Sequence, residues 1–143
     1  MAKRKVCGGA ATMITLVLLA SPLFAHHGFT VEYDSSNCAT VTGTLTKLQW
    51  ENPHVYFYVD AKDASGNPAS WAFEAVSLEW LKRVGTTRRD FSDNIGKTVT
   101  VRACMARNGT KNRGAAETLK LEDGRTITVG TDYEHPKAGG DNN

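Results

Sequence analysis

The sequence lacks the motifs that usually carry catalysis. No serine lies in a Gly-x-Ser-x-Gly nucleophile elbow, and no His-Glu-x-x-His motif or paired-carboxylate signature is present. Two acid–base pairs can be formed on paper, Glu51 beside His54 and Glu74 near Trp71. Isolated carboxylates on strands are more often solvated than catalytic, so the sequence favours a non-catalytic protein with no catalytic residues.

The chain also lacks an apolar run long enough to span a bilayer. The apolar segment 10–20 is shorter, follows Lys3, Arg4 and Lys5, and is followed by Ala25. This order is typical of a bacterial secretory signal peptide. We expect a signal peptide over 1–25, cleavage after Ala25, a periplasmic or secreted protein, and no membrane span after cleavage.

An excess of charge of one sign is missing as well. The whole chain has 17 basic and 15 acidic residues, a net charge of +2. The expected signal peptide removes three basic residues and no acidic ones, which leaves a mature net charge of −1. A near-neutral domain attracts phosphate backbones and anionic lipids only weakly, so we expect no nucleic-acid partner.

Cysteine is scarce, and its placement is informative. Of three cysteines, Cys7 leaves with the signal peptide, whereas Cys38 and Cys104 remain. An even count in an oxidising compartment predicts a disulfide between them. The alternation of their strands predicts that both side chains point outward from neighbouring strands.

Alternating apolar and polar residues predict a protein built mainly of strands. A phase slip near Lys47 predicts a β-bulge in the first strand, and Ser77 is the expected N-cap of a short helix that Gly85 ends. The predicted strands are 39–50, 55–60, 69–73, 98–107, 117–121 and 126–129.

The order of three strands, a helix and two strands is that of an OB fold. We therefore predict a mainly β fold, a small five- to six-stranded OB-like β-barrel with one short helix between strands three and four. A β-sandwich is the alternative, but seven comparable strands are lacking. The barrel domain is expected over 38–130, between an N-terminal arm at 26–37 and a disordered tail at 131–143.

Four segments together carry a family resemblance. They are Ala25-His26-His27-Gly28-Phe29, Val41-Thr42-Gly43-Thr44-Leu45, Trp50-Glu51-Asn52-Pro53-His54 and Leu121-Glu122-Asp123-Gly124-Arg125. This combination resembles the DUF6152 family of exported bacterial proteins of unknown function. Gly28 stands where the family usually has serine, and the two mature cysteines do not look like a family hallmark. The resemblance implies an exported protein but supplies no mechanism.

Three of the four histidines form a candidate metal site. A mature chain that starts at His26 offers an α-amine and an imidazole that can chelate one ion, and His54 or His27 could complete the site. Nitrogen ligands in a planar arrangement suit copper(II), so copper is the leading candidate and zinc the second. The alternative is that His54 only hydrogen-bonds a loop and that His26 and His27 are cleavage-site sequence.

The second candidate is a ligand-binding face. OB folds bind ligands around strands two and three, where Trp50, Tyr56 and Tyr58 could stack on a sugar, base or peptide. The alternative is that these aromatic residues are ordinary strand residues. The function expected from the sequence is binding of a small ligand or a periplasmic protein, with a copper-binding protein as the runner-up.

Overall fold

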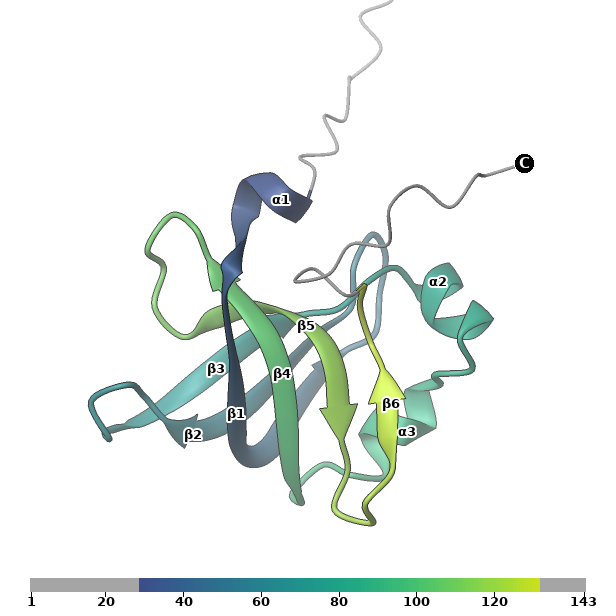
Figure 1. Ribbon diagram of the computed structural model, residues 1–143. Helices are drawn as coiled ribbons and strands as arrows, with labels where there is room; N and C mark the ends of the chain where they lie inside the picture. Colours follow the sequence, from purple (N-terminus) through teal and green to yellow (C-terminus); the bar gives the residue numbers. More distant parts are fainter. Residues whose placement is uncertain (1–28, 132–143) are drawn as a thin grey trace, which may run out of the picture.

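The computed structural model describes residues 29–131, and Figure 1 shows their arrangement. The three helices are α1 (Phe29–Glu32), α2 (Leu78–Arg83) and α3 (Arg88–Ser92). The six strands are β1 (Tyr33–Gln49), β2 (Tyr56–Lys62), β3 (Pro68–Glu74), β4 (Thr98–Ala106), β5 (Arg113–Lys120) and β6 (Thr126–Thr128). The prediction of a mainly β fold with five to six strands is confirmed.

The strands form one continuous sheet that closes on itself. Its order is β3-β2-β1-β4-β5-β6, and an additional pairing joins β3 to β5. The neighbours along this order are antiparallel, whereas β3 and β5 run parallel through Ala72–Glu74 and Arg113–Ala115. Strands β1, β2, β3, β5 and β4 therefore form a ring, and β6 extends it beside β5 (Figure 1).

The interior of the ring is filled by the residues that alternate along its strands. Val55, Phe57 and Val59 are all completely buried, as the alternation in this segment predicts. The register between β1 and β2 shifts between Leu45 and Lys47, which confirms the bulge predicted from the phase slip. This irregularity lets one long strand pair with β4 in its first part and with β2 in its last.

The prediction of one helix between strands three and four is wrong, because two short helices lie there. The hydroxyl of Ser77 accepts from the backbone N–H of Trp80 at the start of α2, as expected of an N-cap. At the start of α3, the carboxylate of Asp90 accepts from the backbone N–H of Thr87 at 2.8 Å. Phe91 of α3 is completely buried and belongs to the core cluster, so this helix covers part of the core.

Cys38 and Cys104 are joined by a disulfide, as predicted. They are direct partners on β1 and β4. Cys104 is completely buried, although it is not part of the core cluster inside the ring. Its sulfur lies 3.6 Å from the carboxylate oxygen Oε1 of Glu117 on β5.

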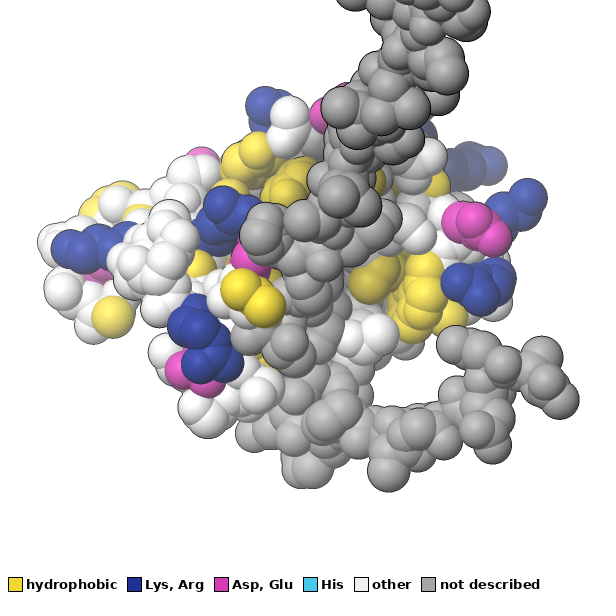
Figure 2. Space-filling view, turned by 90° about the horizontal axis from the view of Figure 1, so that it is seen from above, with side chains coloured by type: hydrophobic (Ala, Val, Ile, Leu, Met, Phe, Trp, Pro, Cys, Tyr) yellow, Lys and Arg dark blue, Asp and Glu magenta, His cyan; other side chains and the backbone are white. Residues whose placement is uncertain are grey.

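Within the described range 29–131, none of the helices has the length and apolar composition needed to cross a membrane. The face seen in Figure 2 shows Lys and Arg side chains spread among acidic ones, without one continuous basic patch. This distribution agrees with the small net charge of the sequence.

Candidate functional site

A polar cluster lies where four segments of the ring meet. Glu74, the last residue of β3, is only 3% exposed. The hydroxyl of Tyr33 donates to its Oε2 at 2.6 Å, Nη2 of Arg113 donates to the same oxygen at 3.4 Å, and Nδ1 of His54 contacts its Oε1. We call these four residues the Glu74 cluster.

The topology explains why residues far apart in sequence meet here. Tyr33 begins β1, and Arg113 begins β5, which pairs in parallel with the end of β3 at Glu74. His54 lies in the turn that leads into β2, directly before Val55. The backbone oxygen of Val55 accepts from the N–H of Ala75, and its N–H donates to the oxygen of Val76, which holds this turn against the end of β3. Closing the ring therefore brings the four side chains together.

Arg113 supplies the charge that balances the buried carboxylate. Besides contacting Glu74, its Nε donates to the hydroxyl of Tyr33 at 3.2 Å, and its Nη2 lies 3.9 Å from Oε2 of Glu32. A buried carboxylate is tolerated when it is paired and hydrogen-bonded. Three hydrogen-bonding side chains, one of them the cationic Arg113, therefore surround the buried carboxylate.

Two tyrosines beside Glu74 are held in the neutral form. Burial and the hydrogen bond to Glu74 raise the pKa of Tyr33 well above its usual range. Burial, followed by a hydrogen bond to the same carboxylate, raises the pKa of Tyr56 to about 12. Both phenols therefore act as hydrogen-bond donors to Glu74 rather than as bases at neutral pH.

His54 is a partly exposed member of the cluster, with 36% of its side chain accessible, close to the 39% of Arg113. Its ring is oriented by the contact between Nδ1 and Glu74. An imidazole whose Nδ1 donates to a carboxylate presents Nε2 as its basic nitrogen, the arrangement common to metal-ligating and acid–base histidines. The cluster can therefore position one imidazole nitrogen.

The other predicted metal ligands cannot be placed. His26 and His27 lie outside the described residues, so their proposed meeting with His54 stays a prediction. Of the acid–base pairs suggested by the sequence, neither is the principal contact, because the structure pairs His54 with Glu74 rather than with Glu51. Each suggested pair contained one member of the observed pair, His54 in the first and Glu74 in the second.

The three aromatic residues predicted to form one ligand face have separate environments. Trp50 packs against Phe91 of the core at 5.8 Å between ring centroids. Tyr58 donates to Oε1 of Gln49 at 2.6 Å, whereas Tyr56 is hydrogen-bonded to Glu74. Each of the three aromatic residues therefore has its own partner, Phe91 for Trp50, Gln49 for Tyr58 and Glu74 for Tyr56. Their role as one ligand-binding face stays a prediction.

A groove of about 950 Å³ lies elsewhere, between the first part of β1 and the far end of the β2–β3 hairpin. We call it the hairpin groove. Its walls are residues 39–43, 60–64 and 68–71. This volume is in the range of small-molecule sites. The groove arises because β1 pairs with β2 only from Thr44 onward, so the two strands diverge on the other side of Gly43.

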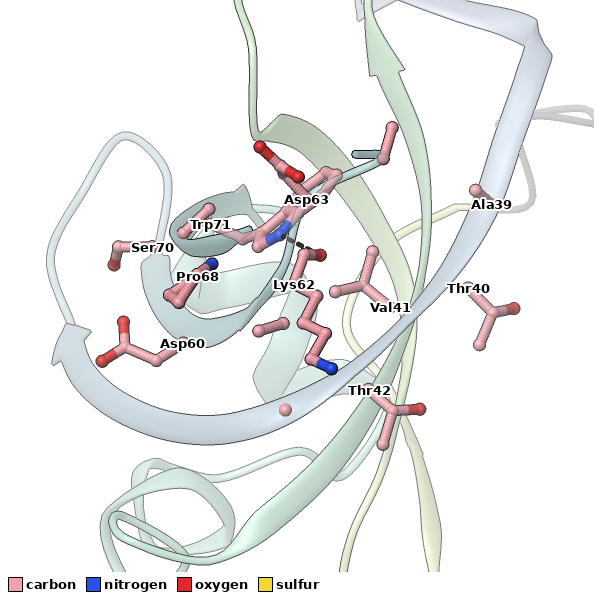
Figure 3. A pocket seen from close by; sticks show the side chains of 14 residues that line it. Ala39, Thr40, Val41, Thr42, Asp60, Lys62, Asp63, Pro68, Ser70 and Trp71 are labelled. Atoms are coloured by element: carbon pink, nitrogen blue, oxygen red, sulfur yellow. Dashed lines mark hydrogen bonds between the residues drawn. The ribbon is translucent and has the colours of Figure 1, made fainter. Parts of the chain in front are cut away.

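The side chains that face this groove are mainly apolar. In Figure 3, Val41, Lys62 and Trp71 lie on one side of β1, whereas Thr40 and Thr42 lie on the opposite side. Nε1 of Trp71 donates to the backbone oxygen of Lys62 at 3.3 Å, which fixes the indole. The ring of Trp71 therefore offers a flat apolar surface beside one cationic side chain.

Sequence reasoning missed Tyr33, Arg113 and Trp71 as site residues. Arg113 stands in a basic, glycine-containing segment, 108–114, that does not look like a strand, although β5 begins at this residue. Trp71 alternates with Ala69 and Phe73, a pattern typical of core positions, and only the divergence of β1 from β2 leaves it beside a groove. Gly43 is a weak sequence signal for the groove, because a glycine inside a strand often marks the close approach of another backbone. An added Cβ at this position would lie 2.3 Å from the backbone oxygen of Asp60.

Comparison with known proteins gives a family and no characterised relative. Residues 13–116 match the model described as "Family of unknown function (DUF6152)". No curated protein and no solved structure matches the chain.

Proposed function

The chain belongs to the DUF6152 family, and from this premise we propose that it is an exported, non-catalytic protein that binds a small ligand. Export is supported by the signal-like segment 1–25 and by the Cys38–Cys104 disulfide, a bond typical of oxidising compartments. The hairpin groove is the observation that carries the binding proposal.

We propose that the ring is an OB-type barrel. The cyclic strand order β1-β2-β3-β5-β4, with the helices α2 and α3 between β3 and β4, supports this assignment. OB folds commonly bind ligands on the face around their second and third strands, and the hairpin groove is lined by these strands.

The groove favours a ligand with an apolar, flat part and a polar end that contacts Lys62. Trp71 supplies an aromatic surface, and Val41 and Ala69 supply apolar walls. Lys62 supplies a positive charge, and the carboxylates of Asp60 and Asp63 also line the groove. Aromatic rings contribute most of the binding energy in such sites because they bury a large apolar area at low cost in conformational entropy. Small ligands with these properties are the proposed class.

A fluorescent probe of this class, anilinonaphthalene sulfonate, tests the proposal. We expect the mature protein to bind it with a rise in fluorescence, and Ala69→Trp, which fills the groove, to weaken binding at least about tenfold. The matched control Ser65→Trp adds the same side chain at the exposed hairpin turn, outside the groove lining. Equal binding by both variants would contradict the assignment of the groove.

A second candidate function is copper binding by His26 and His54. The specific observation in its favour is the contact between Nδ1 of His54 and the buried Glu74, because carboxylates commonly orient metal-ligating imidazoles in this way. His26 is six positions before Glu32, which contacts Arg113 of the same cluster. Residues 29–32 form helix α1, so only the three steps from His26 to Phe29 can be extended, and the chain from His26 to Glu32 spans at most about 15 Å.

Copper(II) titration of protein that starts at His26 tests this candidate. We expect one equivalent to bind, and His54→Ala to weaken binding at least about tenfold. His135→Ala is the control, because this histidine belongs to the proposed tail. Unchanged copper binding by the His54→Ala variant would remove His54 from the site.

A further inference from the structure

A buried carboxylate contacts the disulfide on the opposite side of the sheet from the core. Glu117 is 5% exposed, and its Oε1 lies 3.6 Å from Sγ of Cys104. Its other oxygen, Oε2, is 3.3 Å from Nε of Arg102. A disulfide sulfur carries no proton to donate, so the contact with Oε1 is not a hydrogen bond in the oxidised protein.

The position of Glu117 follows from an irregularity in β5. Arg102 is paired with Thr118 and Ala103 with Ala116, which leaves Glu117 as the extra residue of a β-bulge. Bulges redirect side chains and are enriched beside functional sites. The backbone oxygen of Glu117 accepts from the N–H groups of Val129 and Gly130, which hold the bulge in place.

The ligand atoms of Cys38, Cys104 and Glu117 all lie within 4.8 Å of one another. Two thiolates and one carboxylate are a donor set for zinc(II), and thiolates also favour copper(I). In tetrahedral zinc sites, with zinc–sulfur bonds of about 2.3 Å, two sulfurs lie about 3.8 Å apart. Cys38 and Cys104 are direct partners with Cα atoms 3.8 Å apart, so rotation of their side chains can bring the reduced sulfurs to this spacing.

We propose that reduction of the Cys38–Cys104 disulfide creates a binding site for a thiophilic metal ion, formed by the two cysteines and Glu117. The reductant is a dithiol, whose thiolate attacks the partly exposed Cys38 sulfur and releases the sulfur of Cys104, which takes up a proton. The second thiol of the reductant then displaces Cys38. Two electrons and two protons pass to the protein, and the dithiol becomes a disulfide. Metal binding afterwards releases the two thiol protons.

Cobalt(II) is a spectroscopic probe for this site, because thiolate ligation produces a sulfur-to-cobalt charge-transfer band. We expect the band in the reduced mature protein and not in the oxidised protein. Competition with zinc(II) should remove it, and a copper(I) arm should show whether that ion also binds. The oxidised protein retains every histidine, so it serves as the control for metal bound elsewhere.

Three variants sharpen the test in the reduced state. Glu117→Gln should weaken zinc binding at least about tenfold and keep the charge-transfer band, whereas Cys38→Ser should remove most of the band. Glu122→Gln, an exposed residue, should bind like the wild type. Equal zinc affinity of the Glu117→Gln variant and the wild type would overturn the three-ligand site. Equal binding by oxidised and reduced protein, or loss of β-structure on reduction, would also overturn it.

Discussion

The two ends of the β2–β3 hairpin are built in opposite ways. At one end, Tyr56 is paired with Glu74, whose buried carboxylate is surrounded by three hydrogen-bonding side chains, one of them cationic. At the other end, Lys62 is paired with Pro68, beside an open groove with small and apolar walls. Six strand residues separate the two ends, a distance of about 20 Å.

This difference separates residues that hold the fold from residues available for binding. The Glu74 cluster joins the starts of β1 and β5 to the end of β3, so each of its side chains helps to close the ring. The hairpin end is instead stabilised locally, by the Asp63 carboxylate accepting from the backbone N–H groups of Ser65 and Asn67. Exposed side chains at this end, such as Lys62, can therefore change without disturbing the ring.

The largest effect on stability is expected from Glu74→Ala. Removing the carboxylate leaves Arg113 and Tyr33 without their shared partner, and the free energy of unfolding should fall by about 3 kcal/mol. Urea unfolding followed by circular dichroism measures this change. Glu51→Ala, at an exposed position, should change stability by less than about 0.5 kcal/mol. Similar effects of the two substitutions would show that the cluster does not hold the ring closed.

Gly43→Ala is expected to have the next largest effect, because it acts at the boundary between the ring and the groove. Its Cβ would lie 2.3 Å from the backbone oxygen of Asp60, so β1 and β2 must move apart. We expect a loss of about 1–3 kcal/mol, and altered binding of anilinonaphthalene sulfonate. Asn37→Ala, at an exposed site on the same strand outside the groove lining, is the control. Unchanged stability and binding in Gly43→Ala would show that the close approach of β1 and β2 at Gly43 does not shape the groove.

A smaller effect is expected at alkaline pH. Burial and the hydrogen bond to Glu74 raise the pKa of Tyr56 from 10.0 to about 12 in the folded state. The neutral phenol is favoured by folding, so this contribution is complete below pH 10 and is lost as the pH rises toward about 12. Urea unfolding across this range should show the decline, and Tyr56→Phe should reduce it. A Tyr56 phenolate that forms at pH 10 in the folded protein would contradict this expectation.

The smallest effect on stability is expected from Lys62→Ala, at the groove end. Lys62 is exposed, so the free energy of unfolding should change by less than about 0.5 kcal/mol. Binding of the anionic probe should nevertheless weaken about two- to fivefold, the range of a solvent-exposed ion pair. Thermal unfolding and probe titration on the same sample measure both quantities. A large loss of stability with unchanged binding would show that the groove end holds the fold and does not bind the probe.

The features that the sequence predicted are those decided by neighbouring residues. The bulge at Lys47 follows from a change of alternation, the cap at Ser77 from local helix chemistry, and the pairing of Cys38 with Cys104 from the number of cysteines. The missed helix α3 also had a local signal, since Asp90 stands three positions after Thr87 and can bond back to it.

The candidate sites could not be predicted because closure of the ring creates them. His54 and Glu74 are 20 positions apart, and Tyr33 and Arg113 are 80 positions apart. No periodicity specifies which ends of which strands meet when β3 pairs in parallel with β5. Likewise, the burial of Glu117 depends on a bulge in β5 that the alternation of its small residues does not reveal.

The central claim is that ligands bind at the hairpin groove and not at the Glu74 cluster. Amide chemical-shift mapping during titration with anilinonaphthalene sulfonate tests this most directly. We predict that the largest amide chemical-shift changes occur in residues 39–43 and 60–71. Shifts centred on His54, Tyr56 and Glu74 would contradict it and would place the binding site at the polar end of the hairpin.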